Sequence, residues 1–185
     1  MGRHRRIMRD EILDAAECVL VELGTAGLSI SAVAQKAGVS KSTVLYDHKS
    51  KTALLEALID RRINQKFERQ ALEIMAAGSA PNPELFGRIR DAEKIDEEAR
   101  HAMAMVMRVS VSRSGKLGKK IQDVMLSDLQ KMASGARPRS ALMAYLALSG
   151  FYFTEIIGFY SWDPEERAKI FEGVRAIYES YPETD

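Results

Sequence analysis

The chain has 185 residues, of which 46% are hydrophobic and 29% are charged, a composition that excludes an intrinsically disordered protein and allows a sizeable core. Its formal net charge is only +1, so affinity for nucleic acid would have to come from the distribution of charge. The single cysteine, Cys18, excludes an intrachain disulfide and, with no apolar signal segment in the sequence, predicts a cytoplasmic protein. The basic residues nearest the start of the chain are Arg3, Arg5, Arg6 and Arg9.

Apolar residues recur at helical spacing throughout the chain, and no sustained period-two alternation occurs, which predicts an all-α protein. The first expected helix carries an apolar stripe that ends at Gly24. Two short helices follow, capped by Ser29 and Ser40 and separated by a turn at Gly38. Ser50 is expected to cap a long helix.

The second half of the chain predicts further helices. Asn82 and the following Pro83 form a helix-start signal for a helix, continuous or broken, that runs to about Ser112. An apolar stripe over residues 121–132 predicts the next helix, and the last two are expected over residues 141–160 and after a capping box at residues 163–166.

The mostly apolar stretch from Ala141 to Trp162 raises the alternative of a membrane span. Thr154, Glu155 and several tyrosines within it favour a buried helix of a soluble bundle, so no membrane partner is expected.

The most informative stretch, residues 29–51, reads SISAVAQKAGVSKSTVLYDHKSK and resembles the DNA-binding core of the TetR family of transcriptional regulators. Two positions depart from the family pattern: Leu45, where an aromatic residue is usual, and His48, where an aromatic or aliphatic residue is usual. The matching positions are Ser29, Val33, Ala34, Ala37, Gly38, Val39, Ser40, Thr43, Tyr46 and Lys51.

The resemblance implies an N-terminal three-helix helix-turn-helix DNA-binding domain and a C-terminal helical domain for ligand binding and dimerisation. We expect the first domain in residues 1–50 and the second in residues 51–185, with residues 51–76 as the connecting helix. The expected partners are a double-stranded DNA operator, a second copy of the chain and a small hydrophobic effector.

The recognition helix is expected to enter the major groove, where Lys41 would bond guanine and Thr43 would touch a thymine methyl. Hydroxyls and amides at the helix starts, with later basic residues, would hold phosphates. Arg5 and Arg6 would reach DNA as a basic arm, or form a solvated tail. The expected DNA-binding residues are Ser29, Ser31, Ser40, Lys41, Ser42, Thr43, Tyr46, Lys49, Lys51, Arg5 and Arg6.

His48 has two interpretations. When protonated it would donate to a phosphate, and when neutral it would pack beneath the fourth helix; we favour the packed interpretation.

The final two helices carry more apolar surface than one helical face needs, which predicts that they form the dimer interface. Flexible and aromatic side chains of the second domain would line an effector site, or else belong to a filled core. Glu155 would pair across the dimer, which we favour, or bind a ligand amine. The candidate effector-binding residues are Phe67, Met103, Met107, Met125, Phe151, Tyr152 and Glu155.

No metal centre and no cofactor are expected, because the three histidines lack motif spacing and Met103, Met105 and Met107 cannot all face one ion from a helix. The sequence contains neither a phosphate-binding glycine loop nor a nucleophile-and-base signature, which argues against an enzyme. We therefore expect a regulator, a repressor released from a palindromic operator by a small apolar effector. The alternatives are a regulator without effector, an enzyme and a protein-interaction module.

Overall fold

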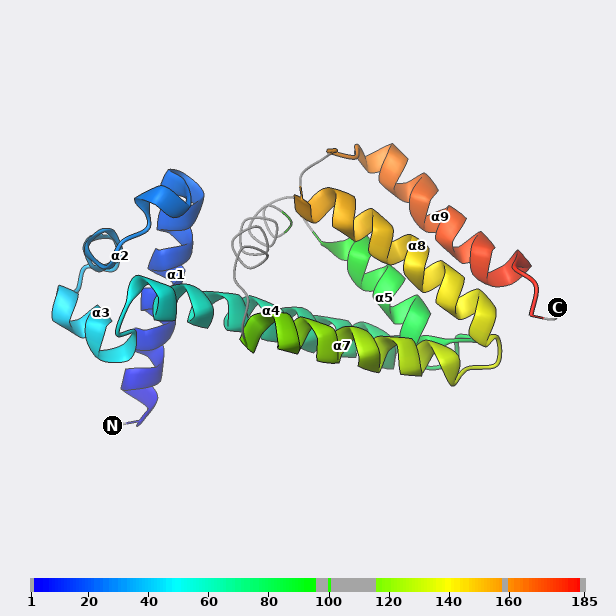
Figure 1. Ribbon diagram of the computed structural model, residues 1–185, viewed down its shortest axis with the longest axis horizontal. Coiled ribbons are helices and arrows are strands. Elements are labelled where there is room, and N and C mark those ends of the chain that lie inside the picture. Colours follow the sequence, from blue (N-terminus) through cyan, green and yellow to red (C-terminus); the bar gives the residue numbers. More distant parts are fainter. Residues whose placement is uncertain (1, 96–99, 101–115, 158–159, 184–185) are drawn as a thin grey trace.

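The computed structural model describes residues 2–95, 100, 116–157 and 160–183. Within these residues every regular element is an α-helix, which confirms the expected all-α class (Figure 1). The helices are α1 (Gly2–Gly27), α2 (Ile30–Lys36), α3 (Lys41–Asp47), α4 (Lys51–Ala76), α5 (Pro83–Lys94), α7 (Lys116–Ala133), α8 (Pro138–Ile157) and α9 (Pro164–Ser180).

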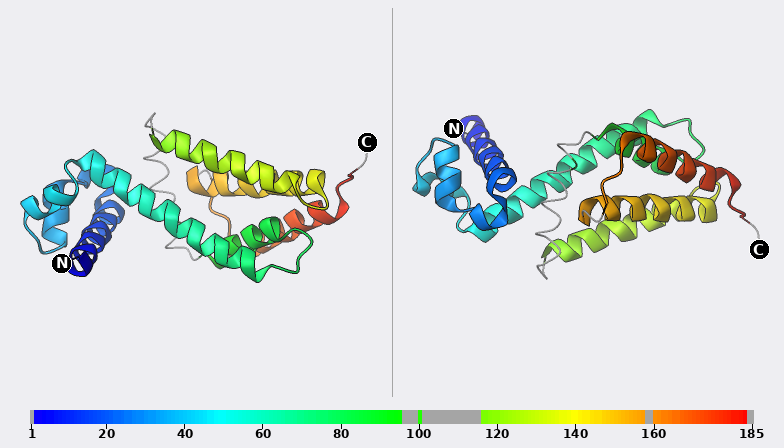
Figure 2. Two further views of the ribbon diagram at one scale, coloured as in Figure 1. Left: turned by 90° about the horizontal axis from the view of Figure 1, so that it is seen from below. Right: turned by 90° about the horizontal axis from the view of Figure 1, so that it is seen from above.

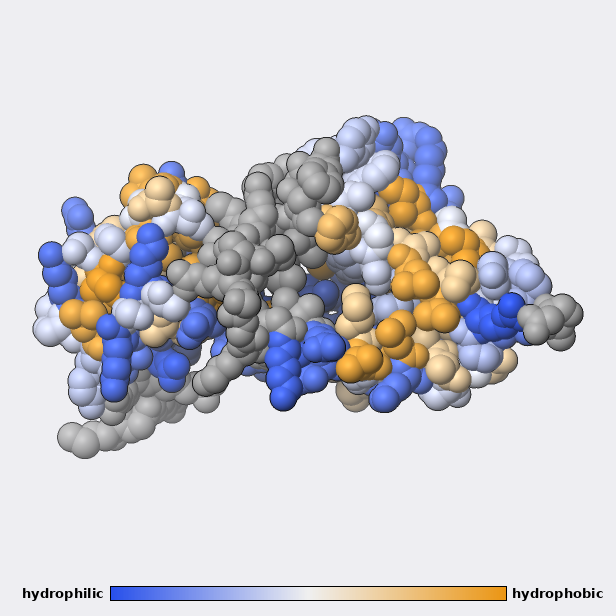
Figure 3. Space-filling model, viewed as in Figure 1, coloured by the Kyte–Doolittle hydropathy of each residue, from blue (hydrophilic) through white to orange (hydrophobic). Residues whose placement is uncertain are grey.

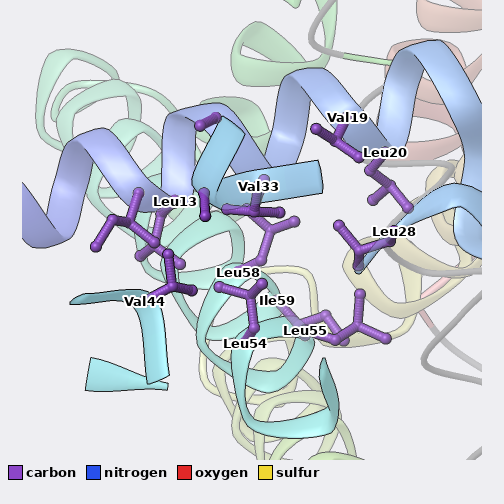
Figure 4. Packing of buried hydrophobic residues seen from close by; sticks show 14 of the residues in the cluster. Leu13, Val19, Leu20, Leu28, Val33, Val44, Leu54, Leu55, Leu58 and Ile59 are labelled. Atoms are coloured by element: carbon purple, nitrogen blue, oxygen red, sulfur yellow. The ribbon is translucent and has the colours of Figure 1, made fainter. Parts of the chain in front are cut away.

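The first three helices gather at one end of the molecule, and the long helix α4 runs from them to the other helices (Figures 1 and 2). Their core lies between α1, α2, α3 and the first half of α4, where Leu20, Val33, Val44 and Leu58 are fully buried (Figure 4). This core fixes the directions of α2 and α3 relative to α4.

Helix α1 begins earlier than expected, at Gly2, so the backbone that carries Arg5 and Arg6 is helical rather than a tail or an extended arm. The reason is local: arginine and methionine are good helix formers, and no residue before Ile12 breaks a helix. At the other end of α1, Gly24 adopts a φ of 65°, which breaks the helix where the sequence predicted.

The short helices begin at the predicted caps. Ser29 Oγ accepts a hydrogen bond from Ala32 N at 3.1 Å, and Ser40 Oγ accepts one from Thr43 N at 3.1 Å. Gly38, with a φ of 66°, makes the turn between them. These contacts confirm the predicted helix-turn-helix geometry.

The second half of α4 packs closely against α5, which begins at the predicted Asn82 cap. At the crossing point Gly87 is buried, and a Cβ atom there would lie 2.5 Å from the Ile74 Cα atom. Helix α5 ends at Lys94 because Ile95 is extended, with φ −67° and ψ 120°. Of the two expectations for this stretch, a continuous or a broken helix, the helix is therefore broken after Lys94. The rest of the stretch to Ser112 lies almost wholly outside the described residues.

Helices α5, α7, α8 and α9 share a second core, in which Ile89, Met132, Leu148 and Phe171 are fully buried. The predicted capping box at the start of α9 is present, since the side chain of Asp163 accepts from the backbone of the first turn. No helix in the described part of the chain has the length and apolar character needed to cross a membrane.

Candidate functional site

Helix α3 presents one exposed face and one buried face. Val44 is buried in the core, whereas Lys41, Ser42, Leu45 and Tyr46 are exposed, and Tyr46 keeps 69% of its surface. Positions 41, 42, 45 and 46 lie on the same side of a helix. The exposed face thus combines a cation, a hydroxyl, an aliphatic and a phenol group, which suits contact with base edges.

Leu45 belongs to this exposed face, and the sequence interpretation treated it only as a departure from the family pattern. The sequence could have shown this, because residues four apart, such as Lys41 and Leu45, lie on the same face of a helix. An exposed aliphatic side chain on such a face matches the chemistry of a thymine methyl.

The hydroxyl groups at the start of α3 hold one another. Ser40 Oγ lies 2.7 Å from Ser42 Oγ and 2.8 Å from Thr43 Oγ1. Because this cluster engages the Thr43 hydroxyl, and Thr43 is partly buried, Ser42 and Lys41 are the more accessible groups at the start of the helix.

Lys49 and Lys51 lie just beyond α3 and are exposed, as is Ser31 in the first turn of α2. Lys51 Nζ donates a hydrogen bond to the Thr25 carbonyl oxygen at 2.7 Å. This bond ties the start of α4 to the end of α1, and the exposed ammonium has donors left for a phosphate.

His48 is only 2% exposed, which confirms the packed interpretation. Its backbone N–H ends α3 by donating to the Val44 carbonyl, and within the described residues its buried Nε2 atom has no hydrogen-bond partner. Burial, with a smaller contribution from the charge of Arg9, lowers the pKa of His48. The neutral imidazole therefore supports the fold rather than holding a phosphate.

Arg5 and Arg6 lie in the first turns of α1, and their side chains are outside the described residues.

Ion pairs connect α1 to α4. Arg61 of α4 donates to Asp14 Oδ1 at 2.6 Å and to Glu17 Oε2 at 3.0 Å, and Arg62 also pairs with Glu17. Arg61 and Glu17 are each largely buried at this contact. The group of helices that carries α3 is thereby held at a defined angle to α4.

A cavity of about 620 Å³, largely open to solvent, lies between α4, α5 and α7, a size typical of small-molecule sites. Phe67, expected to bind an effector, lines it. The lining residues are Phe67, Gln70, Ala71, Ile74, Arg88, Lys119, Asp123, Val124, Ser127, Asp128 and Lys131.

The other candidate effector residues do not come together at the cavity. Phe151 packs against Phe171, with ring centroids 5.1 Å apart, in the core between α8 and α9. Met125 is exposed, because its neighbour Val124 takes the position on α7 that faces the cavity. Met103 and Met107 lie outside the described residues. Tyr152 is partly buried and lies under the Lys66 ammonium.

Glu155 has a partner that sequence reasoning did not identify. It forms an ion pair with Arg167 of α9 in the same chain, and Arg167 also donates to the Ala92 carbonyl oxygen at 3.1 Å. The carboxylate is thus compensated without a second subunit or a ligand amine.

Acidic, histidine and cysteine side chains do not group into a metal site anywhere in the part of the chain that the structure describes.

A three-helix head with one exposed helical face, joined by a long helix to a separate helical core with a cavity, is the architecture of a helix-turn-helix transcriptional regulator. Comparison with known families agrees. Residues 12–58 match the model of bacterial regulatory proteins of the tetR family, and residues 91–179 match that of a tetracyclin repressor-like C-terminal domain. The chain belongs to the TetR family of DNA-binding transcriptional regulators. Regulators of this family bind DNA and dimerise, and they are generally not enzymes.

Solved structures share the fold. A transcriptional regulator from Rhodococcus sp. Rha1 is 18% identical, with a TM-score of 0.67 over 92% of this chain and 96% of its own. A TetR-family regulator from Mesorhizobium loti is 20% identical, with a TM-score of 0.66 over 95% of this chain and 96% of its own. SmeT in complex with triclosan is 17% identical, with a TM-score of 0.61 over 92% of this chain and 90% of its own. No curated protein matches the sequence.

Proposed function

We propose that the chain is a cytoplasmic repressor that binds a palindromic operator as a homodimer and leaves it when a small apolar effector fills the cavity between α4, α5 and α7. The observation that carries the proposal is that α4 takes part in both sites. Its first half is ion-paired to α1, and its second half lines the cavity. A ligand that displaces α4 would change the distance between the two three-helix heads of the dimer, which carry the exposed faces of α3.

In this proposal residues 1–50 form the DNA-binding domain, residues 51–185 bind effector and dimerise, and α4 connects the two. Lys41, with Thr43 and Leu45, reads bases in the major groove. The remaining exposed hydroxyl and basic groups hold phosphates and fix the register on the duplex.

The operator is found by selecting bound duplexes from a random pool and measuring their affinity by fluorescence anisotropy. We expect a palindrome with half-sites about one helical turn apart, as two-fold symmetry requires. Reporter transcription that falls on expression of the chain supports repression. If reporter transcription rises instead, the chain is an activator and the proposed repressor role is refuted.

The outer faces of α8 and α9 are the proposed dimer interface. Leu142, Leu146 and Gly150 follow one another at helical spacing on α8, and Leu146 is 48% exposed although it is aliphatic. Figure 3 shows apolar side chains gathered over α8 and the adjoining part of α7. Such a surface on a soluble protein marks an interface.

Leu146→Asp tests this interface, because a carboxylate desolvated between two subunits costs several kcal/mol. Sedimentation should show a dimer for the wild type and a monomer for the variant. Leu72→Asp is the matched control, since Leu72 is exposed on α4 and should leave the dimer intact. A monomeric wild type that binds single half-sites with full affinity would refute the dimer.

The open cavity between α4, α5 and α7 supports an effector over the alternative of a regulator without one. The triclosan complex of SmeT supports this, because that protein of the same fold holds a small molecule. Its occupant in this chain is found by screening apolar compounds for thermal stabilisation and for release of operator.

Two neighbouring substitutions on α7 test whether the cavity is the site. Val124 lines the cavity and Met125 does not, so Val124→Trp should abolish the response to a screening hit, and Met125→Trp should preserve it. Both variants should bind operator. Equal responses in the two variants would place the ligand elsewhere.

A further inference from the structure

Gln70 is the polar member of an otherwise apolar stripe on α4. Ile63, Phe67, Gln70 and Ile74 follow one another at helical spacing, so they share one face of the helix. Phe67, Gln70 and Ile74 line the cavity between α4, α5 and α7, with Gln70 in the middle of the three. Hydrophobic packing alone would favour an aliphatic side chain at this position, so the glutamine is a polar group set into an apolar part of the cavity wall.

The side-chain amide of Gln70 is buried without a partner. Gln70 is 8% exposed, and it makes no hydrogen bond to any residue that the structure describes. A buried amide that lacks hydrogen bonds costs free energy, which a group able to donate and to accept would recover. Because Gln70 lines a cavity that is largely open to solvent, a ligand can bring such a group to it.

The buried charge of the cavity wall is already compensated. Arg88 is the buried cation among the lining residues, and it pairs with Glu84 Oε2 and with Asp128 Oδ1, each at 2.5 Å. Its Nε atom has no hydrogen-bond partner among the described residues, but burial keeps that atom from contact with the cavity. The remaining charged side chains of the wall lie on α7 and are exposed: Lys119, Asp123 and Lys131. The buried part of the wall therefore offers a ligand hydrogen bonds rather than an unpaired charge.

We propose that the effector is a neutral, largely apolar molecule with a primary carboxamide or lactam group, which Gln70 recognises through a pair of hydrogen bonds. Both groups hold a carbonyl acceptor and an N–H donor on the same side, where they match the donor and the acceptor of the glutamine amide. The apolar body of the molecule lies along Phe67 and Ile74 of α4 and Val124 of α7. The inference rests on the proposed function, because it names the chemistry of the effector for the same cavity.

Three naphthalene compounds with the same apolar body test the polar group by isothermal titration calorimetry. They are 2-naphthamide, methyl 2-naphthoate, which accepts hydrogen bonds but cannot donate, and 2-naphthoate, which is an anion. Gln70→Met keeps the length of the side chain and removes its amide. This variant should bind 2-naphthamide about tenfold more weakly than the wild type and should change the affinity for the ester by less than about threefold.

Gln65→Met is the matched control, because it removes an exposed glutamine amide of α4 that does not line the cavity. It should leave the affinity for all three compounds unchanged. If Gln70→Met weakens the amide and the ester equally, or weakens neither, recognition by Gln70 is refuted.

The wild type alone provides a second readout, which holds even if Gln70→Met does not fold. It should bind 2-naphthamide more tightly than 2-naphthoate, because the buried wall has no free cation for a carboxylate. Tighter binding of 2-naphthoate, or no binding of 2-naphthamide at millimolar concentration, would refute the proposed effector class.

Operator binding in the presence of each compound separates this inference from the proposed function. If 2-naphthamide binds through Gln70 without affecting the operator, the amide site stands and the effector mechanism fails. If the amide and the ester release operator equally in wild type and Gln70→Met, the effector mechanism stands and the amide site fails.

Discussion

Replacing Lys51 tests how the protein divides its contacts between phosphates and bases. Each phosphate contact contributes about 0.9 to the slope of log affinity against log salt concentration. A dimer that loses two such contacts should lose about 1.8 from the slope, so that between 50 and 200 mM salt its affinity should fall about 12-fold less than that of the wild type. Lys51→Ala should weaken all operator sequences alike.

Fluorescence anisotropy at several salt concentrations measures this slope. Lys36→Ala is the matched control, because it also removes one positive charge from the head, but Lys36 is 2.5 Å from Glu22 and thus already compensated. Since Lys51 also donates to the Thr25 carbonyl, thermal unfolding must show that the variant stays folded. A slope unchanged in Lys51→Ala, or changed equally in Lys36→Ala, would refute the phosphate contact.

Three further predictions concern specificity, packing and pH. Lys41→Ala should relax preference at one base pair by about 1–3 kcal/mol, and a selection that returns the wild-type preference would contradict this. Gly87→Ala should destabilise the fold by about 1–3 kcal/mol in denaturant titrations, because its Cβ would lie 2.5 Å from the Ile74 Cα atom and a rotamer change cannot relieve a backbone clash. His48 contributes stability that is present above its ordinary pKa of 6.5 and lost as pH falls through its lowered folded pKa, so His48→Gln should lose less thermal stability than wild type between neutral and acid pH.

The features predictable from sequence were those decided by neighbours in the chain. Ser29, Ser40 and Asp163 cap their helices because each side chain meets amides two or three residues away. Burial of His48 was favoured because the family that the motif resembles usually has an aromatic or aliphatic residue at this position, and the side chain is 2% exposed. Such local patterns also carried the family resemblance.

The features that sequence did not predict depend on which helical faces meet. Val124 faces the cavity and Met125 does not, a choice made by the packing of α7 rather than by hydropathy. Lys66 and Tyr152 are far apart in sequence, and only the fold brings the ammonium over the ring. Arg167 of α9 reaches Glu155 of α8, a contact that no local spacing rule describes.

A final prediction about operator geometry follows from the ion pairs between the first half of α4 and α1. Arg61 joins α1 to α4 through Asp14 and Glu17, and we expect this contact to help the hydrophobic core hold the three-helix head at its angle to α4. Asp14 is exposed but Arg61 and Glu17 are largely buried, so losing these pairs should cost at least about 1 kcal/mol in each protomer, which allows a loss of operator affinity of roughly 30-fold or more in the dimer.

A head that is held less firmly should also discriminate less between operator spacings. Arg61→Met should therefore shrink the penalty for inserting one base pair between the half-sites, because the looser head adjusts to the new separation. Lys169→Met is the control: it breaks an ion pair of 2.6 Å to Glu165 that lies wholly within α9 and should change neither affinity nor spacing preference. If Arg61→Met keeps the full spacing penalty, the ion pairs of Arg61 do not set the angle of the head, and the hydrophobic contact between α1 and α4, with the Arg62–Glu17 pair, must hold it.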